Sequence, residues 1–147
     1  MKSLRVATCQ FSVEPMIAHN RKEILRLMGR AHDDGADVAH FSECALSGYA
    51  GVEFPDITTL DWESLKAATR DIQQRAKELK LWVLLGSTHQ LSDGHKPHNS
   101  VYVINDRGQI VNRYDKRFCT GTDGRTPTLD LQHYSPGNRN CVFRIKG

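Results

Sequence analysis

Apolar residues follow two different spacings along the chain, and each spacing predicts one type of secondary structure. Where apolar residues alternate with polar ones or form short runs, we predict the strands Leu4–Val13, Asp37–Phe41, Leu81–Leu85, Asn99–Ile104, Gln109–Tyr114 and Cys141–Ile145. Where they recur three or four positions apart, we predict the helices Asn20–Asp34 and Trp62–Lys80. The opening order of strand, helix and strand is typical of a parallel pair with a right-handed crossover, so we expect an α/β fold.

Capping and turn residues set the expected ends of these elements. Asn20 followed by Glu23 has the spacing of a helix cap, and Asp61 is the expected cap of the second helix. Gly35 is expected to end the first helix, and Gly108 to supply the positive φ of a hairpin turn. Each helix carries one apolar stripe, so we expect both helices on the same face of the sheet.

Composition narrows the class of protein. The 147 residues are 39% hydrophobic and 25% charged, which is typical of a single soluble globular domain. The formal charge of +3, without a block of basic residues, predicts no nucleic-acid partner. No apolar run approaches the roughly 20 residues of a membrane span, and the first residues enter a strand pattern instead of a signal peptide. We therefore expect no membrane partner and a cytoplasmic location.

The sequence does not indicate a metal or cofactor site. Its four cysteines form no C-x-x-C pair, so we expect neither a zinc knuckle nor a disulfide framework. His89, His95 and His98 crowd one loop, but Gly94 and Pro97 disfavour helical presentation, and no cysteine or carboxylate cluster completes a ligand set. No glycine-rich phosphate-binding motif occurs, so no cofactor is expected.

Two residues of opposite charge each follow a predicted strand. Glu43 comes just after Asp37–Phe41, and Lys116 comes just after Gln109–Tyr114. In open α/β sheets ligands bind beyond the carboxyl ends of strands, where a carboxylate can accept a proton and an ammonium can stabilise developing negative charge. An ordinary ion pair at the rim of the sheet explains the spacing equally well. The basic residues of this region are more typical of a solvated hairpin face than of a phosphate site; they are Arg107, Arg113, Lys116 and Arg117.

Three blocks of sequence resemble the carbon-nitrogen hydrolase family, also called the nitrilase family. They are F-S-E-C-A-L-S-G-Y around Glu43, R-Y-D-K-R-F around Lys116, and D-x-x-x-Y-S-P-G from Asp130 to Gly137. The N-S-V-Y strand that begins at Asn99 is similar as well. The resemblance implies a four-layer αββα sandwich. It also implies hydrolysis of small amides, carbamoyl compounds or nitriles by a Glu, a Lys and a Cys.

The resemblance further implies a role for each site residue. Glu43 would be the general base, Lys116 would stabilise the tetrahedral intermediate, and Asp130 would be the supporting acidic residue, where the family usually has Glu. Ser42 stands where the family more often has Pro. The nucleophilic Cys of the family follows the strand that corresponds to Cys141–Ile145. Residues 1–147 are therefore expected to be the amino-terminal half of one domain, truncated before that Cys and inactive by itself.

Two functions stay open at this point. The parent protein is expected to hydrolyse non-peptide carbon-nitrogen bonds of small molecules; the alternative is a catalytically inactive folding or interaction module on the same scaffold. Cys44 is expected in the core. Cys119 is the only candidate for a substitute nucleophile, because a nearby ammonium such as Lys116 can lower the pKa of a thiol, but nothing in the sequence fixes it near Glu43. In the resembling family a second sheet covers the first, so we expect a homo-oligomer that hides the apolar sheet face.

Overall fold

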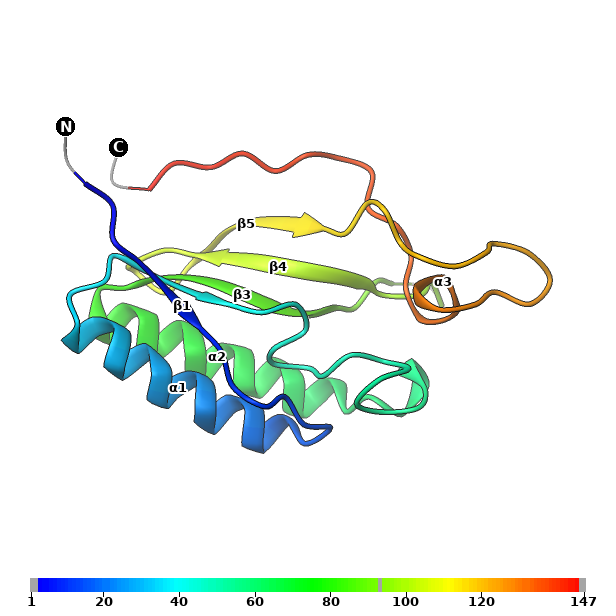
Figure 1. The fold of residues 1–147 in the computed structure, drawn as a ribbon, viewed down its shortest axis with the longest axis horizontal. Coiled ribbons are helices and arrows are strands. Elements are labelled where there is room, and N and C mark those ends of the chain that lie inside the picture. Colours follow the sequence, from blue (N-terminus) through cyan, green and yellow to red (C-terminus); the bar gives the residue numbers. More distant parts are fainter. Residues whose placement is uncertain (1–2, 93, 146–147) are drawn as a thin grey trace.

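The computed structural model describes residues 3–92 and 94–145 and has two layers, a mixed sheet and a pair of long helices on one of its faces (Figure 1). Its elements, in chain order, are β1 (Val6–Cys9), α1 (Ile17–Asp33), β2 (Val38–Phe41), the 3-10 helix η1 (Ile57–Thr59), α2 (Trp62–Leu79), β3 (Trp82–His89), β4 (His98–Ile104), β5 (Ile110–Asp115) and α3 (Asp130–His133).

The strand directions bring several carboxyl ends to one edge of the sheet. Within the described residues the strand order is β1-β2-β3-β4-β5. The first three strands are parallel, whereas β4 pairs antiparallel with both β3 and β5. β5 therefore runs in the same direction as β2 and β3, and these strands end along the same edge. The expected α/β fold is confirmed, and its α and β layers are those of one half of an αββα sandwich.

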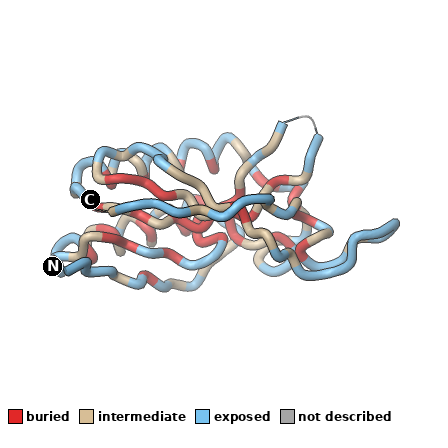
Figure 2. Tube along the Cα trace, turned by 90° about the horizontal axis from the view of Figure 1, so that it is seen from above, coloured by how far each residue is buried: buried red, intermediate tan, exposed pale blue. Residues whose placement is uncertain are grey.

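The core lies between the sheet and the two long helices. Ile24 and Met28 of α1 and Ile72 and Ala76 of α2 are fully buried. Figure 2 shows buried positions gathered in the middle of the molecule and exposed ones on the outer helix turns and loops. Because α1 and α2 also contact each other, both cover the same face, as their single apolar stripes predict. Within residues 3–92 and 94–145, no helix combines the length and the apolar character that a membrane crossing requires.

The two long helices differ at their first turns, where free backbone N–H groups need hydrogen-bond acceptors. α1 begins at Ile17, so the prediction that Asn20 caps it was wrong. The Asn20 side chain is buried and instead accepts from the Glu14 N–H at 2.9 Å and donates to the Glu14 carbonyl at 2.7 Å, which fixes the turn before the helix. Asp61 does cap α2, where its Oδ1 accepts from the backbone N–H of Ser64 at 3.0 Å.

The length of each strand depends more on the strand it pairs with than on the apolar pattern of its own sequence. β1 has four residues, far fewer than the predicted Leu4–Val13, because its partner β2 is itself four residues long. β3 continues to His89, beyond the predicted end at Leu85, because Ser87 and the two residues after it pair with β4. The predicted hairpin between β4 and β5 is confirmed, and Gly108 in its turn has φ +75°.

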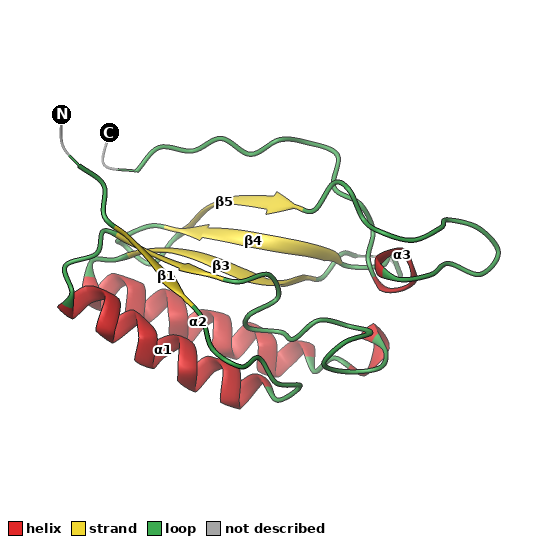
Figure 3. Ribbon diagram, in the orientation of Figure 1, coloured by secondary structure: helices red, strands yellow, loops and turns green. Residues whose placement is uncertain are grey.

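The predicted strand Cys141–Ile145 is not formed. Figure 3 draws this segment as a loop, and Figure 1 shows it next to β5 on the side of the sheet away from the helices. The Asn112 side chain of β5 donates a hydrogen bond to the Val142 carbonyl at 3.3 Å. A strand would need a ladder of backbone–backbone hydrogen bonds instead. The short helix α3 was not predicted, because four residues give no periodic signal.

Candidate active site

Glu43 and Lys116 lie at the edge where the parallel-running strands end. Glu43 is two residues beyond β2, and Lys116 directly follows β5. Gly86 of β3 makes room for the turn that carries Glu43, because a Cβ there would lie 1.9 Å from the Ser42 carbonyl oxygen. The backbone N–H of Lys116 donates to the Asn99 carbonyl at 2.8 Å. Both positions are therefore fixed by the main chain of neighbouring strands.

The structure brings together all three residues that the sequence singles out. The Lys116 Nζ lies 2.9 Å from Glu43 Oε1 and 2.9 Å from Asp130 Oδ2. This confirms the expected proximity of the three groups, well within the reach needed to act on one small molecule. The Glu43 side chain is 49% exposed and that of Asp130 only 5%, so the cluster opens to solvent at Glu43 and is closed at Asp130.

Asp130 is held in its ionised form. Thr120 donates its backbone N–H to Oδ2 at 2.9 Å, and the Tyr49 hydroxyl donates to Oδ1. Burial opposes ionisation, but the hydrogen bonds from Tyr49, Thr120 and Lys116 together lower the pKa of the Asp130 carboxyl. The shorter side chain of Asp therefore serves here as a charged partner of Lys116.

Lys116 is held as an ammonium. Its partial burial favours the neutral amine, but the hydrogen bonds to Glu43, Tyr49 and Asp130 outweigh this effect and raise its pKa. At neutral pH the group keeps its proton. It can therefore stabilise negative charge on a substrate but cannot serve as a base.

Two residues of the cluster were missed by the sequence analysis. Tyr49 accepts a hydrogen bond from Lys116 at 3.1 Å, and Asn99 donates its side-chain N–H to Glu43 Oε1 at 2.6 Å. Both lie in blocks that resemble the family, so the signal was present without a role attached to it. Their contacts join residues far apart in the chain, which periodicity does not reveal.

The surroundings of Cys44 and Cys119 disfavour the thiolate form. Cys44 is fully buried, as predicted, and burial raises its pKa to about 12. Burial and the charge of Asp130 raise the pKa of Cys119 and outweigh the lowering effect of Lys116, so the expected effect of Lys116 is present but the net pKa is raised. Its thiol donates to the backbone carbonyl of Lys116 at 3.8 Å.

We expect the Cys44 thiol to resist alkylation by iodoacetamide at pH 7.5 in the folded protein, because the thiolate is the reactive form and burial suppresses it. Peptide mapping by mass spectrometry measures the modified fraction of Cys44 against time. The control is the same reaction in urea, where every thiol is accessible. Equal rates of Cys44 labelling with and without urea would contradict the burial.

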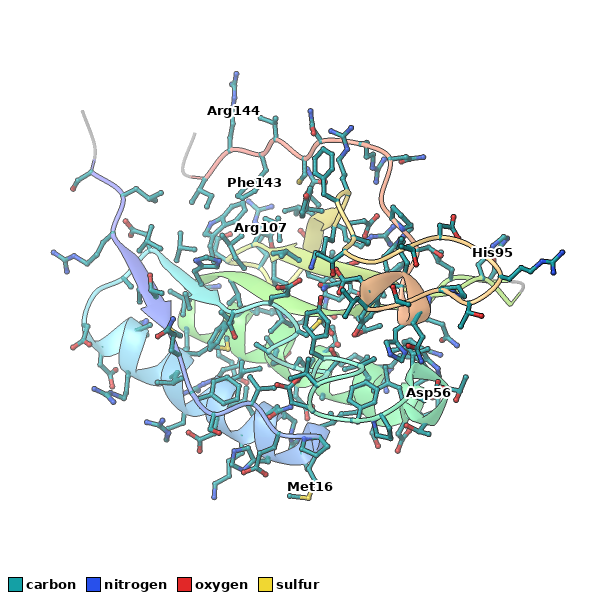
Figure 4. All side chains as sticks on the ribbon, turned by 45° about the vertical axis from the view of Figure 1, so that its right-hand side comes forward. Met16, Asp56, His95, Arg107, Phe143 and Arg144 are labelled. Carbon is teal, nitrogen blue, oxygen red and sulfur yellow. The ribbon has the colours of Figure 1, made fainter. Side chains whose placement is uncertain are left out.

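The remaining polar groups named in the sequence analysis do not assemble into one site. His98 is bonded to the Ser135 carbonyl at 2.7 Å, whereas His89 contacts the Tyr102 hydroxyl. His95 and Arg107 lie toward opposite ends of the sheet (Figure 4). In the part of the chain that the structure describes, no group of three or more His, Cys, Asp or Glu residues could hold a metal ion.

The arginines near the hairpin are divided among separate partners. Arg113 is paired with Asp115 at 2.7 Å, and Arg117 donates to the Asn140 side chain at 2.6 Å. Arg107 lies at the hairpin turn beside α2.

A cavity of about 630 Å³ lies between the first turns of α1 and α2, and none of the charged site residues lines it.

Known proteins match nearly the whole chain. The sequence profile described as carbon-nitrogen hydrolase matches residues 5–142. Omega-amidase NIT2 of Xenopus tropicalis is 27% identical over 146 residues, which are 97% of this chain and 51% of that protein. Glutamine-dependent NAD(+) synthetase of Xylella fastidiosa is 32% identical over 98% of this chain and 26% of its own length.

Solved structures match the fold. The NitN amidase of Nesterenkonia sp. AN1 superposes with a TM-score of 0.83 and 18% identity over 99% of this chain and 54% of that protein. The chain thus spans about half the length of the amidase relatives. The family profile covers most of the chain, including Lys116, Asp130 and the turn that carries Glu43. The chain therefore belongs to the carbon-nitrogen hydrolase family.

Proposed function

We propose that Glu43, Lys116 and Asp130 form the proton-transfer and charge-stabilising part of a site that hydrolyses small amides. The observation that carries the proposal is the position of the Lys116 ammonium, 2.9 Å from one carboxylate oxygen of each acidic residue at one edge of the sheet. The Glu43 carboxylate is exposed and lies beside the fixed Lys116 ammonium. This arrangement suits a general base that contacts a substrate arriving from solvent. The buried Asp130 keeps the ammonium charged and in place.

In the proposed reaction Glu43 takes the proton of a thiol, and the thiolate attacks the amide carbon. The carbonyl π electrons move to oxygen, and Lys116 stabilises the resulting oxyanion. Collapse of this intermediate expels ammonia, which takes its proton from Glu43, and leaves a thioester. A water molecule, deprotonated by Glu43, then attacks the thioester and releases the acid and the thiol.

The thiol is proposed to come from a cysteine outside these 147 residues. Cys44 is buried beneath the site, and Cys119 has a raised pKa and points to a backbone carbonyl. A variant of the Nesterenkonia amidase carries the acetamide moiety of fluoroacetamide on its active-site cysteine, which supports thiol chemistry in this family. By itself the 147-residue chain is proposed to be an inactive amino-terminal part of one domain.

The substrate proposed here is a small carboxamide. The relatives include omega-amidases, other amidases and glutamine-dependent enzymes, and this favours an amide over a carbamoyl compound or a nitrile. No metal or cofactor takes part in the proposed steps. A cytoplasmic location and association of copies through the sheet face stay predictions.

The test measures ammonia release by the complete protein that carries this sequence, with ω-amides, N-carbamoyl amino acids and nitriles as substrates. We expect hydrolysis of amides, and the variant Glu43→Gln is expected to lose about 100-fold in kcat/KM because it removes the base. Glu63→Gln, an exposed position on α2, is the matched control and is expected to keep full activity. Activity with no compound would favour the alternative, an inactive folding or interaction module.

A further inference from the structure

The Lys116 ammonium is surrounded by three oxygen acceptors in the described structure. It donates to Glu43 Oε1 at 2.9 Å and to the Tyr49 hydroxyl at 3.1 Å, and it forms an ion pair with Asp130 Oδ2 at 2.9 Å. An ammonium has three donors, and three oxygen atoms lie within 3.1 Å of this one. A substrate oxygen can receive a hydrogen bond from Lys116 only if one of these bonds is given up.

The Tyr49 bond is the weakest of the three. The other two acceptors are carboxylates, whose negative charge attracts the ammonium, whereas the Tyr49 oxygen is neutral. The Tyr49 bond is also the longest. The phenol oxygen is therefore the acceptor that an incoming oxyanion replaces at the lowest cost.

The Tyr49 hydroxyl also determines where Asp130 lies. Its proton is donated to Asp130 Oδ1, which leaves a lone pair for Lys116. Burial and the hydrogen bond with Asp130 raise the pKa of Tyr49 to about 12, so the hydroxyl keeps this proton at neutral pH. One oxygen atom thus links the supporting acid to the ammonium.

Tyr49 itself is held on several sides. Its ring meets that of Tyr134 edge to face, with centroids 5.6 Å apart and an interplanar angle of 83°. Its backbone N–H donates to Glu53 Oε2 at 2.7 Å, and the Lys116 Nζ lies 5.5 Å from the ring centroid. The hydroxyl is fixed in place before any substrate arrives.

We propose that Tyr49 is a positioning residue, whose hydroxyl fixes Asp130 against Lys116 and reserves the third N–H of the ammonium for the substrate oxygen. This inference rests on the proposed function. In the resting site the N–H is held by a neutral acceptor. The N–H shifts its hydrogen bond from Tyr49 to the substrate oxygen as negative charge develops on that oxygen. This hydrogen bond to the substrate is gained in the transition state, so it acts on kcat.

The test compares Tyr49→Phe with the unchanged protein by two readouts. Phenylalanine keeps the ring contact with Tyr134 and removes only the hydroxyl. In the complete protein we expect kcat to fall about tenfold with KM nearly unchanged, because Asp130 loses the hydrogen bond from Tyr49 that fixes it against Lys116. In a ¹³C NMR titration of carboxyl groups we expect the pKa of Asp130 to rise, because it loses a donor.

The control is Tyr114→Phe, which is expected to change neither readout, because the Tyr114 hydroxyl makes no hydrogen bond among the described residues. An Asp130 pKa equal to that of the unchanged protein, or a kcat equal to it, would overturn the inference. The titration needs no substrate. If the unchanged protein hydrolyses no amide, the proposed function fails and the inferred role falls with it, while the titration still reports whether Tyr49 holds Asp130.

Discussion

Replacing Lys116 by methionine is expected to lower kcat/KM for amides at least about 1,000-fold, the largest loss among the single changes considered. Methionine keeps the length of the side chain but has no charge and no donor. In the proposed reaction, the variant loses the group that stabilises the oxyanion. It also leaves the Glu43 and Asp130 carboxylates close together without a cation between them, which raises the pKa of Asp130 and disorders the base.

Steady-state kinetics of the complete protein measure this loss. Lys66→Met is the matched control, because Lys66 is an exposed residue of α2 that pairs with Glu63. We expect the control to keep its activity, since exposed pairs contribute little. A Lys116→Met variant with a tenth or more of the original activity would remove Lys116 from the proposed chemistry.

Gly86→Ala is expected to destabilise the fold by about 3 kcal/mol, the upper end of the usual cost of overpacking. The added Cβ would lie 1.9 Å from the Ser42 carbonyl oxygen and 2.8 Å from the Cys44 backbone nitrogen. These atoms belong to the main chain, so no side-chain rotation relieves the clash. The turn that carries Glu43 has to move away from β3, and activity falls together with stability.

Urea unfolding followed by circular dichroism measures the free energy of unfolding of each variant. Gly124→Ala is the control, because a Cβ at Gly124 meets no atom within 4 Å. The control is expected to change stability by less than about 0.5 kcal/mol. If Gly86→Ala were as stable as Gly124→Ala, the close approach of β3 to the Glu43 turn would be wrong.

Local patterns predicted the two long helices and the five strands but not most of their ends, and they also predicted a strand at Cys141–Ile145 that is not formed. The helices were recognisable because their apolar stripes repeat over four or five turns, and Asp61 caps α2 as its spacing indicates. By contrast, β3 extends to His89 through its pairing with β4, and Asn20 serves the turn before α1 instead of capping it. Pairing partners and buried side-chain contacts are properties of the folded chain.

The same division applies to the site. Glu43, Lys116 and Asp130 could be named from family blocks, because each block is a short local pattern. Tyr49 and Asn99 could not be given roles, because their partners lie 81 and 56 positions away. A hydroxyl that links two charged groups becomes visible only when three distant segments meet.

The loop between β5 and α3 is tied at its base by the bond from the Thr120 N–H to Asp130, and its middle is exposed. With the base pinned, each doubling of the loop length costs only about 0.6 kcal/mol in closure entropy. This stretch is therefore a permissive insertion point. A fluorophore-binding tag or a substrate-binding segment inserted near Gly124 would leave the Lys116 ammonium in place. Evolution or protein engineering could therefore change the loops around the site without changing its charged residues.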